Sequence, residues 1–216
     1  MNNVKLVIFD MDGLMLDTER LAIDASLRAA KEKGYEVKKE YLIETIGCNE
    51  KDSLVIMKGH LGQDFPWEEV RTHTRKLFEE ALDREGVPLK EGLIDLLDFI
   101  DEKGIAKVVA TSTSRNRAEK LLASAGILDR FDDMICGDEV EKGKPEPEIF
   151  LKACKKANAA PEESIILEDS INGLLAASRA GIRCVLIPDL IEPTKENEAL
   201  AYAKVKNLLE VMKLEF

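Results

Sequence analysis

Two aspartates stand one residue apart at the end of an apolar run near the N-terminus. The run 7–9 is followed by Asp10, Met11, Asp12 and Gly13. Alternate side chains of an extended strand point the same way, so Asp10 and Asp12 would face one pocket if strand geometry continues through Asp12. Such a pair suits a divalent cation, or paired nucleophilic and acid/base roles. The alternative is an ordinary turn after a strand.

Three later segments have the composition of a phosphate site. The segment 108–114 (VVATSTS) ends an apolar strand in hydroxyl residues, whose O–H and backbone N–H groups can hold phosphate oxygens. The segment 142–147 (KGKPEP) places Lys144 ahead of a predicted helix, where its ammonium could neutralise a phosphoryl group. The segment 165–170 (IILEDS) ends in Glu168 and Asp169, two more oxygen ligands for a hard cation.

Each of these segments also has a purely structural interpretation. Residues 112–114 could cap a helix, Lys144 could be a solvated loop charge, and Glu168 with Asp169 could cap a strand end. Four such sites on the same ends of successive strands are hard to attribute to capping. The combination therefore favours a single site for phosphoryl chemistry.

The rest of the chain predicts an α/β fold that would bring these segments together. Apolar strands are predicted at 5–9, 106–111, 133–136, 164–167 and 183–187, with helical segments between them from the second onward. This alternation predicts a doubly wound parallel sheet covered on both faces. Ligands of such sheets bind beyond the carboxyl ends of the strands, where the strand order reverses, and all four motifs fall there.

The pattern changes between residues 16 and 87 to uninterrupted helical segments. Helices are predicted at 18–34, 39–46, 50–61 and 67–85, without a convincing strand. The expected organisation is a core domain from residues 1–15 and 88–216, and a helical domain from residues 16–87. Its insertion directly after the first catalytic strand predicts a position above the pocket, with hinges near 13–16 and 86–92.

Together the four motifs resemble the haloacid dehalogenase (HAD) superfamily, specifically its β-phosphoglucomutase-like phosphatase branch, over about residues 5–187. The motifs that carry the resemblance are, in order, Asp10-Met11-Asp12-Gly13-Leu14, Ser112, Lys144 in Gly-Lys-Pro, and Glu168-Asp169. The resemblance implies a Rossmann-like HAD core whose helical cap closes over the substrate. It also implies that Asp10 is the nucleophile, Asp12 the general acid/base, and Lys144 the cation that binds phosphate.

The remaining ligands follow from the same resemblance. Ser112 and the backbone of Thr113 would hold phosphate oxygens. Mg²⁺ would be organised by Asp10, by the Asp12 carbonyl, and by Asp169 with Glu168. The expected activity is Mg²⁺-dependent hydrolysis of a small phosphorylated metabolite, such as a sugar phosphate, through an aspartyl-phosphate intermediate.

Two other functions are weighed against a phosphatase. A β-phosphoglucomutase-type mutase carries a His, a Lys and an Arg in its cap, where this chain has Ala22, Ile46 and Glu50. The loss of a proton-shuttling imidazole and of two cations disfavours turnover of a sugar bisphosphate. A non-catalytic protein that binds phosphometabolites would lack nucleophile or metal residues, yet all are present.

The composition of the chain argues against several other classes of protein. The formal charge is −11, from 31 Lys+Arg against 42 Asp+Glu, which argues against binding to nucleic acid or anionic membranes. No stretch approaches the roughly twenty apolar residues of a membrane span, and the N-terminus lacks a signal-peptide pattern. A cytoplasmic monomer is expected. The four cysteines are widely spaced, which predicts core residues and neither zinc nor disulfides.

Overall fold

The computed structural model describes residues 4–46 and 50–214. The chain divides into two compact units, Met1–Asp17 with Val87–Phe216, and Thr18–Gly86. The domain boundaries predicted at residues 15 and 88 lie within two residues of these divisions. Gly47 and Cys48 lie outside the described residues, as does the side chain of Glu50.

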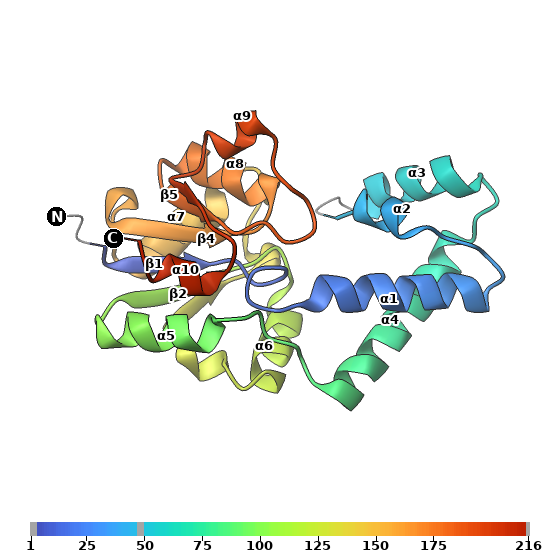
Figure 1. Cartoon of the computed structure of the whole chain (residues 1–216), viewed down its shortest axis with the longest axis horizontal. Helices are drawn as coiled ribbons and strands as arrows, with labels where there is room; N and C mark the ends of the chain where they lie inside the picture. Colours follow the sequence, from blue (N-terminus) through green and yellow to red (C-terminus); the bar gives the residue numbers. More distant parts are fainter. Residues whose placement is uncertain (1–3, 47–49, 215–216) are drawn as a thin grey trace. The chain divides into compact units, whose positions relative to one another are not determined.

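The first unit contains a parallel sheet of six strands in the order β3-β2-β1-β4-β5-β6 (Figure 1). Its strands are β1 (Leu6–Phe9), β2 (Ala106–Ala110), β3 (Asp133–Ile135), β4 (Ser164–Glu168), β5 (Arg183–Leu186) and β6 (Ala203–Lys204). The chain leaves β1 toward β2 and β3, and later resumes on the other side of β1 with β4. The strand order therefore reverses at β1, and the predicted doubly wound fold is confirmed.

Helices connect these strands and cover the sheet. They are α5 (Leu93–Glu102), α6 (Arg115–Ser124), α7 (Glu148–Lys156), α8 (Ile171–Ala180), α9 (Lys195–Glu198) and α10 (Leu208–Val211), with short 3-10 helices at Leu128–Arg130, Gly137–Glu139 and Pro161–Glu163. Beyond residue 187, where no element was predicted, the structure adds α9, β6 and α10. The short edge strand β6 has only two residues, too few for a periodic pattern in the sequence.

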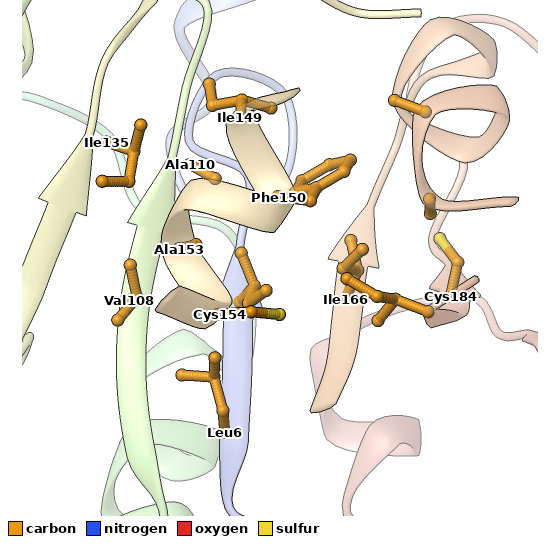
Figure 2. Close-up of a cluster of buried hydrophobic side chains, with 14 of the residues drawn as sticks. Leu6, Val108, Ala110, Ile135, Ile149, Phe150, Ala153, Cys154, Ile166 and Cys184 are labelled. Carbon is orange, nitrogen blue, oxygen red and sulfur yellow. The ribbon is translucent and has the colours of Figure 1, made fainter. Parts of the chain in front are cut away.

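The core on one face of the sheet lies under α7 and α8. Leu6 of β1, Val108 of β2 and Ile166 of β4 are fully or almost fully buried there. Figure 2 shows that Phe150 and Cys154 of α7 lie among these strand side chains. Burial of such side chains stabilises the fold by about 1.5–3 kcal/mol each. This burial holds α7 against β1, β2 and β3.

The opposite face is covered by α5, which packs against β2 and α10. Its buried residues, Leu93, Leu96, Leu97 and Ile100, recur at the spacing of one helical stripe. Gly92 precedes this helix with a positive φ of 83°, and a Cβ there would come within 2.6 Å of Leu209. Glycine is therefore required where the chain returns from the second unit to the sheet.

The second unit is helical throughout its described residues. It consists of α1 (Thr18–Glu32), α2 (Lys39–Ile43), α3 (Glu50–Leu61) and α4 (Trp67–Glu85), which confirms the four predicted helices. Its own core includes Ala29 of α1, Met57 of α3 and Phe78 of α4. Across the described residues, no helix is long and apolar enough to span a membrane.

Candidate active site

Asp10 lies directly beyond the carboxyl end of β1. Regular strand geometry ends at Phe9, although the Asp10 N–H still donates to the Leu167 carbonyl at 3.0 Å. The condition of a regular strand through Asp12 is therefore not met, and Asp12 makes only an isolated β-bridge with Leu16. The chain instead turns, with the Leu16 N–H donating to the Met11 carbonyl at 3.0 Å. Burial is the main cause of the raised pKa of Asp10, and the nearby Asp12 charge adds to it.

Lys144 is the cation of this site. Its side chain is only 5% exposed, which rules out a solvated loop charge. The Nζ atom lies 2.5 Å from Asp10 Oδ1 and 2.6 Å from Glu168 Oε1. It also donates to the Ala110 carbonyl at 3.1 Å, so the ammonium joins the ends of β1, β2 and β4.

The loop that carries Lys144 is held by two neighbouring helices. Arg179 of α8 donates to the Pro145 carbonyl at 2.9 Å and pairs with Glu146 at 2.7 Å. The ring of Phe150, the buried anchor of α7, lies 5.0 Å from Lys144 Nζ. The Lys144–Pro145 peptide bond is cis. These contacts fix the lysine although it comes from a loop.

Glu168 and Asp169 stand at the end of β4. Glu168 is fully buried, and its Oε2 accepts from the Ser170 N–H and from the Ser170 hydroxyl, both at 2.9 Å. A Cβ at Gly173 would come within 1.8 Å of Glu168 Oε1, and a Cβ at Gly13 within 2.2 Å of Asp169 Oδ2. Both carboxylates thus occupy space that only glycine leaves open.

The loop after β2 brings its hydroxyl groups beside Asp12. The Thr113 hydroxyl donates to Asp12 Oδ2 at 2.8 Å, while the Thr113 N–H donates to Thr111 Oγ1 at 3.1 Å. Ser112 is exposed. The amide expected to hold a phosphate oxygen is therefore engaged within the loop, and the Thr113 side chain makes the contact with the catalytic candidates.

Burial and charge shift the proton equilibria of the site. The pKa of Asp10 is raised to about 8, because burial, opposed by Lys144 and assisted by Glu168 and Asp12, disfavours its anion. Burial lowers the pKa of Lys144, but Asp10 and Glu168 more than offset this and the net shift is upward. The Lys144 ammonium therefore keeps its proton, and it faces two carboxyl groups, those of Asp10 and Glu168.

Three of these carboxylates form a potential cation site. Among the described residues, Asp10, Glu168 and Asp169 offer oxygens that all lie within 4.8 Å of one another. Hard carboxylate oxygens suit Mg²⁺, and a divalent cation here would offset the mutual repulsion of these carboxylates. The donor set therefore fits the expected metal. The Asp12 side chain is not part of this cluster.

Several supporting groups were not predicted. Ser170 donates to Glu168, the Ala110 carbonyl accepts from Lys144, and Gly173 leaves room for Glu168. The Gly137 N–H donates to the Thr113 carbonyl in the loop after β2. Ser170 is the N-cap of α8 and accepts from the Gly173 N–H at 3.1 Å, so the spacing Ser-x-x-Gly after β4 was an available signal. The role of the Ala110 carbonyl leaves no signal in the sequence, because every residue carries a carbonyl.

Comparison with known proteins identifies the class of enzyme to which this fold and site belong. The family model described as "Haloacid dehalogenase-like hydrolase" matches residues 7–187, which is most of the chain. The chain belongs to this family of hydrolases, as its motifs predicted.

Individual relatives show which branch of the family the chain resembles. The phosphorylated carbohydrates phosphatase of Thermotoga maritima is 32% identical over 219 residues, covering 97% of this chain and 99% of the relative. Validoxylamine A 7'-phosphate phosphatase of Streptomyces hygroscopicus subsp. limoneus is 32% identical over 211 residues, covering 96% and 95%. A solved structure described as "putative beta-phosphoglucomutase from Thermotoga maritima" has a TM-score of 0.81 at 31% identity, covering 97% of this chain and 99% of that chain. The similarity to the β-phosphoglucomutase-like branch is thereby confirmed.

The close approach of Gly173 to Glu168 yields a stability prediction. Gly173→Ala should lower the free energy of unfolding by about 1–3 kcal/mol, because the new methyl must displace a buried, hydrogen-bonded carboxylate. Gly59 in α3 is the matched control, since a Cβ there meets nothing within 4 Å. Gly59→Ala should be neutral or stabilising by up to about 1 kcal/mol. Urea unfolding measures both, and equal changes would contradict the packing of Glu168.

Proposed function

We propose that the protein is a Mg²⁺-dependent phosphatase that hydrolyses a small phosphorylated metabolite through an aspartyl-phosphate on Asp10. The observation that carries this proposal is the buried ammonium of Lys144, which lies between Asp10 and Glu168 beside a cluster of three carboxylates. A buried cation among an excess of carboxylates costs desolvation free energy and is weak evidence for a stabilising role. It suits a site that must receive a phosphoryl group and a metal ion.

The protein residues divide the reaction between them. An Asp10 oxygen attacks phosphorus, forming the acyl-phosphate bond while the bond to the leaving oxygen breaks. Asp12 donates its proton to that leaving oxygen. Water then attacks the phosphorus of the intermediate, Asp12 takes up the water proton, and Asp10 is released with inorganic phosphate. Lys144 offsets the negative charge that the phosphoryl group brings next to Asp10.

Asp10, Asp169 and the Asp12 carbonyl would bind Mg²⁺ directly. The two Glu168 oxygens already accept from Lys144 and Ser170, so we assign Glu168 to the periphery of the metal site. When bound, the metal supplies positive charge that stabilises the anionic transition state.

Ser112 and Lys144 are the proposed phosphate-binding side chains. Ser112 is exposed at the strand end, where its hydroxyl is accessible to a ligand. The Thr113 N–H could bind a phosphate oxygen only by exchanging its present acceptor, Thr111 Oγ1. The phosphate is therefore held chiefly by charge and by the Ser112 hydroxyl.

The substrate class is proposed from the relatives together with the charge of the chain. By their names, the two phosphatases reported above act on phosphorylated carbohydrates and on validoxylamine A 7'-phosphate. The net charge of −11 disfavours nucleic acid and anionic membranes as partners. We propose a phosphorylated sugar or similar monoester as substrate, a cytoplasmic monomer as the working form, and the unit Thr18–Gly86 as a cap that selects the leaving group.

Replacement of the nucleophile tests this function. Asp10→Asn keeps the size of the side chain but cannot form the acyl-phosphate, so hydrolysis of p-nitrophenyl phosphate should fall below detection. Removal of Mg²⁺ by EDTA should have the same effect on the wild type, and added Mg²⁺ should restore activity. Phosphate release is the measurement, with circular dichroism as the control for folding. Strong activity in Asp10→Asn, or in EDTA, would exclude the mechanism.

A second test separates Lys144 from other lysines. Lys144→Ala should lower kcat by roughly 10²–10³, the scale for the loss of one preorganised electrostatic group. Lys155→Ala is the control, because Lys155 is exposed on α7 and should tolerate the change. Steady-state kinetics on both variants decide the matter. Equal, small effects would show that the ammonium does not act on the phosphoryl group.

The third test distinguishes a phosphatase from a mutase. Because Ala22, Ile46 and Glu50 replace the His, Lys and Arg of a mutase cap, water should be the favoured acceptor of the phosphoryl group. A mixture of β-glucose 1-phosphate and glucose 1,6-bisphosphate should give inorganic phosphate at most, without appreciable glucose 6-phosphate. ³¹P NMR follows both products. Efficient isomerisation without net phosphate release would identify a mutase.

A further inference from the structure

We propose that the Thr113 hydroxyl is the positioning group for the acid/base carboxylate of Asp12. This inference rests on the proposed phosphatase function and assigns to Thr113 a side-chain role in addition to any role of its backbone. The contact that carries it is the hydrogen bond from Thr113 Oγ1 to Asp12 Oδ2 at 2.8 Å. The two residues are 101 positions apart in the sequence and meet because β1 and β2 are neighbouring parallel strands.

Thr113 is itself held on its backbone. Its N–H donates to the hydroxyl of Thr111, which is 1% exposed, and its carbonyl accepts from the Gly137 N–H at 3.0 Å. A Cβ at Gly137 would come within 2.1 Å of the Ser112 carbonyl, so the 3-10 helix after β3 lies directly against this loop. The backbone of Thr113 is therefore held by hydrogen bonds on both its N–H and its carbonyl, and its side chain is half-buried.

Arg115 fastens the loop to the same 3-10 helix. Its N–H donates to Asp138 at 3.0 Å, and its guanidinium donates to Glu139 at 2.8 Å and to the Met134 carbonyl at 2.7 Å. The end of β3 thus braces the loop that follows β2. These contacts explain how a threonine in the loop after β2 can hold the carboxylate of Asp12, which follows β1, in one geometry, as acid/base catalysis requires.

The hydrogen bond has a chemical consequence. Because Oδ2 accepts from Thr113, the transferable proton of Asp12 is assigned to Oδ1. In the first step this proton passes to the leaving oxygen as the phosphorus–oxygen bond breaks, and in the second step Asp12 recovers a proton from the attacking water. Loss of the hydroxyl removes this hydrogen bond from Asp12 Oδ2, so the proton is less often aligned with the leaving oxygen.

A leaving-group comparison tests this role. p-Nitrophenolate is a far weaker base than phenolate and needs less protonation as it departs. Thr113→Val should therefore lower kcat/KM for phenyl phosphate about tenfold more than for p-nitrophenyl phosphate, since general acid catalysis contributes about 10²–10⁴. Thr113→Ser keeps the hydroxyl and should return the ratio of the two kcat/KM values to near that of the wild type.

The control lies on the same loop. Ser114 is exposed and its side chain makes no capping hydrogen bond to α6, so Ser114→Ala should leave the ratio unchanged. Thr113→Ala is a second variant without the hydroxyl if the valine does not fold. Equal losses on both esters, or an unchanged ratio in the folded valine or alanine variant, would overturn the inference. A wild type that hydrolyses neither ester would instead overturn the proposed function.

Discussion

The site depends on one buried cation. Lys144 Nζ contacts Asp10 and Glu168 within 2.6 Å, and its side chain is 5% exposed. Burial of charge is costly unless the partners are close and well oriented. The surrounding structure meets this condition with Ser170 on Glu168, the Ala110 carbonyl on the ammonium, and the contacts of α7 and α8 with the lysine loop. These contacts hold the Lys144 ammonium against Asp10 and Glu168 in a site that is shielded from water.

The parallel sheet supplies the second constraint. Because all six strands run the same way, the residues after β1, β2 and β4 emerge at one edge, and the reversal of strand order at β1 leaves room between the loops. The carboxylates come so close to the backbone that glycine is required opposite two of them, at Gly13 and Gly173. Charge, strand direction and the absence of a Cβ therefore act together to form the acidic cluster.

Most strands and helices could be predicted from the sequence, because hydrophobic periodicity is a local property of the chain. Apolar runs that alternate with helical patterns mark the five principal strands, and the segment Thr18–Gly86 shows only helical periodicity. The two-residue strand β6 was missed because its pattern is too short. The sequence allowed either a longer strand or a turn at Asp12, and the chain turns after Asp10, where the Leu16 N–H donates to the Met11 carbonyl.

The sequence by itself determined which groups are available: the residue types at 10, 12, 112, 113, 144, 168 and 169, and the alternation that predicts the parallel sheet. Only the tertiary structure decided how these groups pair. That Lys144 lies between Asp10 and Glu168, and that Thr113 acts on Asp12 through its hydroxyl while its amide binds Thr111, depends on distances between residues far apart in the chain. Composition and spacing report local backbone preference and hydrophobic periodicity, whereas a hydrogen bond requires two atoms to be within about 3 Å, and folding alone sets that separation.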